Sequence, residues 1–419
     1  MQAPDIHPVE AIWRAEAGKV TARLVRLVRD VGLAEEIAQE ALVAALERWP
    51  VTGVPDNPGA WLMATAKHRA IDELRRARLV QAKHELLAGE AERSTTPRFE
   101  EDADDDVGDD LLRLVFVACH PVLPREAQVA LTLRLLGGLS TGEIARAFLV
   151  PEPTIAQRIV RAKRTLAEKQ IPFEVPRGEA LAPRLHSVLE VVYLVFNEGY
   201  SATAGEDWMR PALCEDALRL GRVLADLVPA EPDVHALVAL MEIQVSRIPA
   251  RTSDAGEPIL LLDQDRAAWD KDAIARGMAA LVRADELAGR RLTPYLVQAQ
   301  IAACHARAST AASTEWPRIA ALYGALGEIA PSPVVDLNRA VALGMAFGPK
   351  AGLDLVDAIA GDPALAGYHL LPSVRGDLLA KLGRFDEARA DFERAAHLTQ
   401  NERERAFLVA RAKACGQRS

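Results

Sequence analysis

The sequence of 419 residues has few aromatic side chains (5%) and few cysteines, and it has no long apolar run. The four cysteines are widely separated without a CxxC pair, so we expect reduced, mostly buried thiols rather than disulfides or a zinc site. No apolar stretch reaches the roughly 20 residues that span a bilayer. The first residues also lack the basic and apolar pattern of a secretory signal. These absences predict a cytoplasmic protein without a membrane partner.

Catalytic fingerprints are missing as well. The chain contains no P-loop, GxSxG, HExxH or dinucleotide-binding pattern, and its nine histidines are scattered. Cys119 and His120 are neighbours, but two adjacent ligands without others rarely hold a metal. The acidic pairs all fall on faces of expected helices. We therefore predict that the protein is not an enzyme and uses no cofactor or metal.

What is present is helical periodicity and an uneven distribution of charge. Half of the residues are hydrophobic, which is enough to form packed cores, and the net charge is -9. Residues 99–110 contain eight acidic side chains and no basic one, whereas residues 111–171 contain nine basic and four acidic ones. We expect an all-α fold with four segments: a helical domain at 1–89, an acidic linker at 90–110, a second helical domain at 111–171 and a helical extension at 172–419.

Two helices stand out in the first domain. The stretch Asp30–Trp49 has one apolar side and one polar stripe, which consists of Glu35, Glu36, Gln39 and Glu40. The next helix begins with Asn57 as its N-cap and Pro58 in its first turn. It carries cations toward its end, a pattern suited to lying along a phosphate backbone: Lys67, Arg69, Arg75, Arg76 and Arg78.

The second domain contains a more specific signal. Ser140 and Glu143 have the spacing of a capping box, which opens a short helix that ends at Phe148. A turn and a second helix, Pro151–Lys169, complete the spacing of a helix-turn-helix. Its predicted buried stripe is Ile155, Ile159, Ala162 and Leu166. The polar side chains left for a DNA groove and its phosphates are Thr154, Gln157, Arg158, Arg161, Lys163 and Arg164.

These two motifs resemble known regions of one protein family. LAEEIAQEAL followed by NPGAWL and AIDELRR resembles region 2 of extracytoplasmic-function sigma factors, in the sigma-70 family. LSTGEIARAFLVPEPTIAQRIVRAKRTL resembles their region 4, and the two matches occur in the family's order. The resemblance covers roughly residues 12–78 and 111–170. It implies a promoter-reading subunit whose partners are promoter DNA and core RNA polymerase, through the β′ and β subunits.

The resemblance also implies roles for individual residues. Asp30, Glu35, Glu36, Gln39 and Glu40 would bind the β′ coiled coil. The −10 promoter element would be read by Asn57, Trp61, Lys67, Arg69, Arg75, Arg76 and Arg78. The −35 element would be read by Thr154, Gln157, Arg158 and Arg161, with Lys163 and Arg164 on the DNA backbone. Pro151 and Pro153 stand where many relatives have serine and glycine, so they cannot offer N–H groups to phosphate.

The C-terminal extension reads as a series of helices. Leu378–Leu398 resembles a tetratricopeptide repeat with Gly383 at its turn, and the whole extension resembles one found in a subgroup of these sigma factors. We expect it to regulate activity. Seven polar or aromatic residues lie in apolar contexts: Asn197, Glu198, Tyr200, Asp265, Arg266, Trp269 and Arg339. They form either a pocket for a ligand or for a protein or peptide partner, or buried ion pairs and caps that fix helix packing.

A second functional interpretation is a helix-turn-helix transcription regulator with a helical sensor domain. This alternative explains residues 111–419 but leaves the paired motifs of the first domain unexplained. It predicts binding to duplex operators without polymerase, whereas a sigma factor binds promoters after joining core enzyme.

Overall fold

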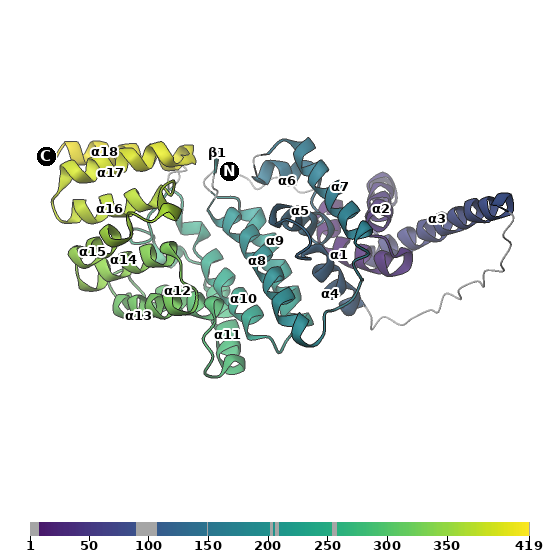
Figure 1. The fold of residues 1–419 in the computed structure, drawn as a ribbon, viewed down its shortest axis with the longest axis horizontal. Helices are drawn as coiled ribbons and strands as arrows, with labels where there is room; N and C mark the ends of the chain where they lie inside the picture. Colours follow the sequence, from purple (N-terminus) through teal and green to yellow (C-terminus); the bar gives the residue numbers. More distant parts are fainter. Residues whose placement is uncertain are drawn as a thin grey trace. The chain divides into compact units, whose positions relative to one another are not determined.

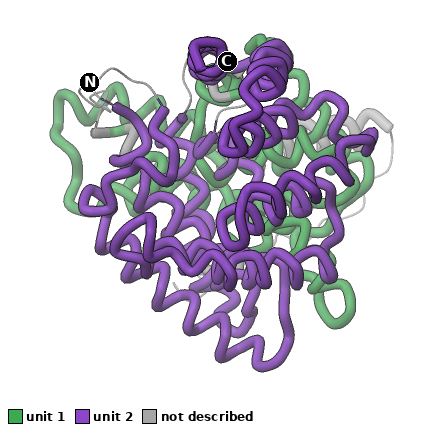
Figure 2. The backbone as a smooth tube through the Cα atoms, turned by 90° about the vertical axis from the view of Figure 1, so that its left-hand side faces the viewer, with its two compact units in different colours: residues 1–191 green, residues 192–419 purple. Residues whose placement is uncertain are grey.

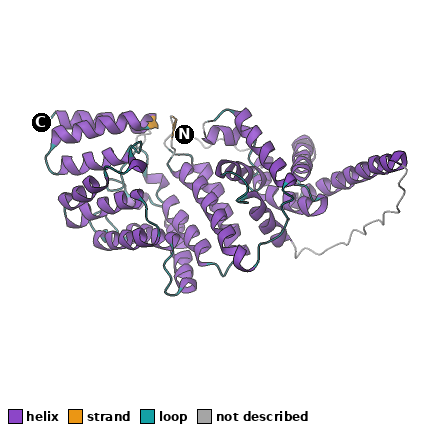
Figure 3. Ribbon diagram, in the orientation of Figure 1, coloured by secondary structure: helices purple, strands orange, loops and turns teal. Residues whose placement is uncertain are grey.

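The structure is a computed structural model that describes residues 8–88, 107–148, 150–201, 204–205, 209–253 and 258–418. The described residues are nearly all helical, which confirms the all-α prediction (Figure 3). The chain divides into two compact units, residues 1–191 and 192–419 (Figure 2). Most of the predicted acidic linker, 90–110, lies outside the described residues. Its last four residues, Val107–Asp110, already belong to a helix.

The described part of unit 1 is built from helices (Figure 1), and we call the predicted segments 1–89 and 111–171 its two helical domains. The first three are α1 (Pro8–Val28), α2 (Val31–Thr52) and α3 (Pro58–Ala88). The next four are α4 (Val107–Ala118), α5 (Arg125–Leu135), α6 (Thr141–Phe148) and α7 (Glu152–Glu168). A single 3-10 turn, η2 (Gly178–Ala180), precedes α8 (Leu181–Tyr200), and the unit boundary falls within α8.

Helix α1 organises unit 1 because it packs against α2, α3, α4 and α5. Its buried face includes Trp13, Ala17 and Leu24, while α3 contributes Leu62 and Ala66. Burial of these apolar side chains stabilises the packing of unit 1 around α1. The first half of α8 also belongs to this unit.

Unit 2 continues as a series of helices, each packed against the next (Figure 1). Its first four complete helices are α9 (Pro211–Leu227), α10 (Pro232–Val245), α11 (Lys271–Ala288) and α12 (Pro294–Arg307). The rest are α13 (Trp316–Ile329), α14 (Pro333–Phe347), α15 (Pro349–Ile359), α16 (Leu370–Lys381), α17 (Phe385–Leu398) and α18 (Glu402–Gly416). Short elements are η3 (Ile248–Ala250), η4 (Arg266–Ala268), η5 (Pro363–Leu365) and the parallel strand pair β1 (Ala204–Gly205) and β2 (Gln400–Asn401).

The predicted repeat illustrates why these helices can approach closely. A Cβ atom on Gly376 would lie 3.1 Å from the ring of Phe392, so a larger residue there would require the ring or α17 to shift. Gly383 has φ +77°, a left-handed conformation that favours glycine, at the turn between these helices. Ala388, Phe392 and Ala395 are buried as the repeat pattern predicts.

The four cysteines, Cys119, Cys214, Cys304 and Cys415, are free and buried, as predicted. Within the described ranges, no helix is both long and apolar enough to cross a membrane. The same residues contain no cluster of three or more His, Cys, Asp or Glu side chains that could hold a metal.

Candidate nucleic-acid interface

The helix-turn-helix forms as the sequence predicts. The hydroxyl of Ser140 accepts a hydrogen bond from the Glu143 N–H at 3.1 Å, and the Glu143 carboxylate accepts one from the Ser140 N–H at 2.7 Å. This reciprocal capping box satisfies backbone donors at the start of α6. The four residues predicted as the buried stripe of the second helix are the four buried residues of α7.

The opposite face of α7 offers cations to solvent. Gln157 and Arg161 are exposed and Arg158 is half-buried, and neither arginine forms an ion pair with a described residue. Thr154 is half-buried in the first turn. Arg164 is exposed and pairs with Glu168 at 2.6 Å, one helical turn away. Such a face can donate hydrogen bonds to base edges and phosphates in a major groove.

The N-terminal half of α3 is fixed in the way its sequence predicts. The Asn57 side chain accepts a hydrogen bond from the N–H of Ala60 at 3.0 Å, which caps the helix. The ring of Trp61 packs edge-on against Trp49 of α2, with centroids 5.4 Å apart. This contact holds Trp61 half-buried at the junction of the two helices.

Most of the described cations of α3 are exposed, Arg69 is half-buried, and three of them pair with nearby acids. Arg69 pairs with Glu40 of α2 at 2.6 Å, while Arg75 and Arg76 pair with acids three residues earlier in the same helix. Lys67 is exposed. The side chain of Arg78 lies outside the described residues. Exposed pairs of this kind contribute little stability, so these cations can be redirected to phosphates at low cost.

The acidic stripe of α2 is only partly exposed. Asp30 is the N-cap of α2 and accepts a hydrogen bond from Leu33 N–H, and Glu36 and Glu40 are exposed. Gln39 is half-buried. Glu35, however, is only 6% exposed, so the prediction that it belongs to a solvent-facing stripe is wrong. The reason is that the second helical domain covers it.

Glu35 joins α2 to two cations of the second helical domain. Arg134 of α5 donates to its carboxylate at 2.8 Å, and Lys163 of α7 forms an ion pair with the other oxygen. Burial disfavours the charged form of Glu35, but Arg134 and Lys163 together outweigh burial and lower its pKa. The structure therefore brings together a predicted polymerase-binding residue and a predicted DNA-binding residue.

A second ion pair and a tight apolar contact lie at the same boundary. Arg14 of α1 pairs with Glu143 at 2.5 Å. Burial acts against ionisation of Glu143, but its hydrogen bonds with Ser140 and the nearby Arg14 lower the pKa below the usual value. A Cβ atom on Gly138 would lie 3.0 Å from Ala17 and 3.2 Å from Trp13, so the turn before α6 rests directly on α1.

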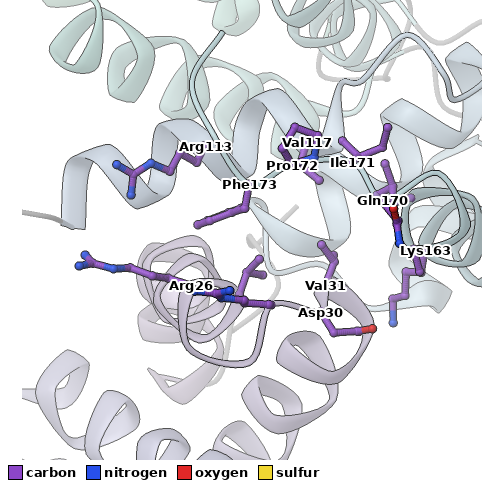
Figure 4. A pocket seen from close by; sticks show the side chains of 14 residues that line it. Arg26, Asp30, Val31, Arg113, Val117, Lys163, Gln170, Ile171, Pro172 and Phe173 are labelled. Carbon is purple, nitrogen blue, oxygen red and sulfur yellow. The ribbon is translucent and has the colours of Figure 1, made fainter. Parts of the chain in front are cut away.

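A cleft of about 810 Å³ opens beside this contact (Figure 4). The α1–α2 turn, α4 and the end of α7 line it. Arg26 and Arg113 in its wall both pair with Asp110, which is 1% exposed. Burial nevertheless raises the pKa of Asp110, because it exceeds the opposing effect of the two arginines. This cleft exists only while the two helical domains of unit 1 are in contact.

Sequence reasoning missed Arg134, Arg14 and Asp110 as members of this boundary. Arg134 is the cation of an otherwise largely buried segment of α5, which is a weak sign of a buried partner. Nothing in the local pattern identifies Glu35 as that partner, because the two residues are 99 positions apart.

The seven residues predicted in the extension divide between the two interpretations. Asn197 is exposed and lines a cavity of unit 2. Glu198 pairs with Arg210, the Asp265 side chain caps η4, and Tyr200 packs under the guanidinium of Arg251 at 3.7 Å. These contacts agree with the interpretation that the residues fix helix packing.

Two of the other three, Arg266 and Trp269, also make intramolecular contacts. Arg266 donates to the carbonyl oxygens of His305 and Ala308 at 2.5 and 2.9 Å. Trp269 is buried beneath Arg266, whose guanidinium lies 4.9 Å from the ring centroid. Arg339 is half-buried on α14. Six of the seven residues therefore do not line the cavity that Asn197 lines.

Comparison with known protein families matches three parts of the chain. Residues 12–80 match Sigma-70 region 2, and residues 113–166 match Sigma-70, region 4. Residues 184–285 match a family of unknown function, DUF6596. The first match accounts for the segment that the regulator alternative leaves unexplained, so that alternative is not favoured.

Curated proteins give the same result. R00370 of Rhizobium meliloti, an uncharacterized protein, is 44% identical over 390 residues, which cover 92% of this chain and 90% of that protein. ECF RNA polymerase sigma factor SigL of Mycobacterium tuberculosis is 30% identical over 159 residues, covering 38% of this chain and 86% of SigL. The probable ECF sigma factor SigI of that organism is 28% identical over 168 residues, covering 40% and 57%. No solved structure matches. With both sigma regions in order and this likeness to SigL, the chain belongs to the extracytoplasmic-function sigma factors, the sigma-70 family proteins that direct transcription initiation.

Proposed function

We propose that this sigma factor binds core RNA polymerase through α2 and reads its promoter through α3 and α7. The observation that carries this proposal is the division of α7 into two faces. One face packs into unit 1 through four buried side chains, and the other presents Arg158 and Arg161 without ion-pair partners among the described residues. A cationic face on a firmly anchored helix is what entry into a major groove requires.

The polymerase-binding surface is the outward strip of α2. Glu36, Glu40 and Glu47 are exposed there at helical spacing, and Val43 and Leu46 beside them are 51% and 40% exposed. Exposed apolar side chains between acids are typical of a protein-binding surface. Its partner is the β′ subunit, with β as the second contact of the bound sigma factor.

The −10 element is read by α3 and the loop before it. Asn57 fixes the start of the helix, and Trp61 lies at its junction with α2. Lys67, Arg75 and Arg76 are exposed along the following turns, where they can follow a phosphate backbone. A half-buried indole supports stacking of a base that leaves the duplex.

The contact between α2 and α7 represents a resting form of unit 1. Promoter elements centred at −10 and −35 are separated by about 25 base pairs, or roughly 85 Å of duplex at about 3.4 Å per pair. Because α3 packs on α2, and α2 is joined to α7 through Glu35 and Lys163, α3 and α7 cannot reach both elements together in this form. The two helical domains of unit 1 therefore separate when the promoter complex forms, which frees both residues for their predicted contacts.

The extension regulates this activity. A truncation that tests this role should end after Val191 rather than before α8. Ser187 donates to the carbonyl of Cys119 at 3.2 Å, and Arg184 donates to the carbonyl of Phe116 at 2.5 Å, so the first half of α8 completes unit 1. Transcription unchanged in level and control after removal of residues 192–419 would contradict a regulatory role.

The first experiment is transcription in vitro with purified core polymerase on a library of genomic fragments. New start sites that require only this protein support the proposal, whereas duplex binding without initiation contradicts it. Arg158→Ala should then reduce initiation about 10- to 100-fold at promoters with the preferred −35 bases, as expected for a lost bidentate base contact. Arg164→Ala is the matched comparison, because a backbone contact should weaken all promoters equally.

A further inference from the structure

Unit 2 contains a cavity of about 710 Å³ that no sigma-factor role uses. Side chains from α8, α10, α12, α13 and α14 line it. Its apolar wall includes Leu240, Ile243, Ile301 and Leu326. This volume lies within the range of about 300–1,000 Å³ that small-molecule sites occupy.

The polar lining of the cavity has an unusual charge balance. Its hydroxyl and amide groups come from Tyr193, Tyr323, Ser332, Asn197, Gln244, Gln298 and Asn338. Arg247 supplies a positive charge. Among the described residues, no aspartate, glutamate or lysine lines the cavity. The site therefore has hydrogen-bond donors and one cation but no carboxylate.

Arg247 is half-buried, and its hydrogen-bond partners among the described residues are neutral. It donates to Gln244 at 3.1 Å and to Gln264 at 3.3 Å, and its guanidinium lies 5.5 Å from the ring of Trp269. Within the described part of the chain it has no carboxylate partner. A half-buried cation that only neutral groups solvate loses hydration without gaining a counter-charge.

A second cation strengthens the positive potential. Among the residues that the structure describes, the buried Arg266 also donates to neutral oxygens, those of His305, Ala308 and Thr314. His305 lines the cavity, and burial first, then Arg247 and Arg266, lower its pKa to about 4. Its Nδ1 is buried without a hydrogen-bond partner. The imidazole is thus neutral at neutral pH and keeps one ring nitrogen unused.

We propose that this cavity binds a small organic anion, with a carboxylate or phosphate head on Arg247 and an apolar body against Ile243, Ile301 and Leu326. Guanidinium groups bind both kinds of head through charge-assisted hydrogen bonds. The head supplies the counter-charge that Arg247 lacks, and the body covers the apolar wall. Tyr193 is already fixed by its hydrogen bond to Gln298 at 3.0 Å, so part of the wall is rigid before a ligand enters.

The test uses the full-length protein and isothermal titration calorimetry with three probes. They are 3-phenylpropionate, phenyl phosphate and the neutral 3-phenylpropanamide, and binding is measured rather than transcription, so the result does not depend on the proposed promoter contacts. We expect one or both anions to bind with a Kd below about 5 mM and the amide not to bind. The preferred anion identifies the head group.

Two variants locate the site. Arg247→Met keeps the apolar stem and should weaken anion binding about 10- to 100-fold, the range for losing charged hydrogen bonds. Gln244→Glu places a carboxylate beside Arg247 without changing side-chain size, so it should compete with the anion and abolish binding. It should also raise the melting temperature of the ligand-free protein by about 2 °C, because it pairs the cation. Arg283→Met, an exposed position on α11, is the control.

Several results would overturn the proposal. They are no anion binding below about 5 mM, equal binding of the neutral amide, or anion binding that survives both Arg247→Met and Gln244→Glu. A Gln244→Glu protein with an unchanged or lower melting temperature would show that Arg247 already has its counter-charge, which also contradicts the argument.

Discussion

Glu35 in unit 1 and Glu242 in unit 2 are both buried carboxylates that each hold two cations. Glu242 of α10 pairs with Arg222 of α9 at 2.5 Å and with Arg276 of α11 at 3.2 Å, so it joins consecutive helices. Glu35 joins α2 to α5 and α7, which are about a hundred residues later. A buried carboxylate with two cations therefore joins consecutive helices in unit 2, whereas in unit 1 it holds together two helical domains that can separate.

The two carboxylates also differ in the exposure of their cations. Arg222 and Arg276 are 47% and 50% exposed, whereas Arg134 and Lys163 are 16% and 17% exposed. Water can replace Glu242 around its arginines more easily than it can replace Glu35 around its partners. We therefore expect substitutions at the Glu35 ion pairs of unit 1 to have larger effects than substitutions at the Glu242 ion pairs of unit 2.

The largest effect is expected from Arg134→Met. It removes one cation from Glu35 but changes no residue proposed to bind polymerase or DNA. The contact between the two helical domains of unit 1 should lose about 2–3 kcal/mol, because Glu35 stays buried with half of its counter-charge. Small-angle X-ray scattering should show a larger radius of gyration, and transcription in vitro should rise. Unchanged scattering together with unchanged transcription would contradict a resting form held by Glu35.

Glu242→Gln should have a smaller effect of a different kind. Unit 2 should lose about 1–2 kcal/mol of unfolding free energy, since the glutamine keeps hydrogen bonds while the two arginines gain water. Urea denaturation followed by circular dichroism measures this loss. Glu286→Gln, an exposed position on α11, is the control and should be nearly neutral. Equal losses in the two variants would mean that burial of Glu242 is unimportant.

Acid should weaken the unit 1 boundary through Glu35. Because its pKa is lowered in the folded protein, its contribution is complete above the ordinary value of 4.5 and is lost as the pH falls through the lowered pKa. Scattering should therefore show opening only below about pH 4.5. Asp110 has a raised pKa, so its contribution to the boundary is kept in acid and is lost as the pH rises, which is the opposite of the dependence expected for Glu35. If scattering showed the boundary opening near neutral pH, a titratable group other than Glu35 would control it.

The smallest effect is expected from Glu387→Gln on α17. Glu387 pairs with Arg384 at 2.6 Å at an exposed surface, with no desolvation to reverse. The melting temperature should change by less than about 1 °C, as for other exposed pairs. If Glu387→Gln destabilised the protein as much as Glu242→Gln does, burial would not be the property that distinguishes these carboxylates.

Much of the fold was predictable because local signals and tertiary packing agree. The helix predicted to begin at Pro58 is α3, the short helix predicted to end at Phe148 is α6, and the predicted helix 151–169 is α7 (Glu152–Glu168). Each starts or stops at a proline, a glycine or a cap that acts within a few residues. The buried stripe of α7 was likewise predictable, since a helical period of 3.6 residues fixes which side chains share a face.

The boundary inside unit 1 was not predictable for the opposite reason. Glu35 has the same local pattern as Glu36, and only a partner about a hundred residues later makes it buried. The cavity of unit 2 was not predictable for the same reason, since its lining comes from five helices between Tyr193 and Asn338. A pattern along the chain reports faces of helices, but not which faces meet.

The capping box at α6 has a genetic consequence. Glu143 both begins α6, through Ser140, and holds α1, through Arg14. Substitution of Arg14 alters the boundary alone, whereas substitution of Glu143 alters the boundary and the DNA-reading motif together. Suppressors of a defective promoter contact should therefore arise at Arg14 far more readily than at Glu143. A change at Arg14 leaves the DNA-reading motif intact, whereas a change at Glu143 does not.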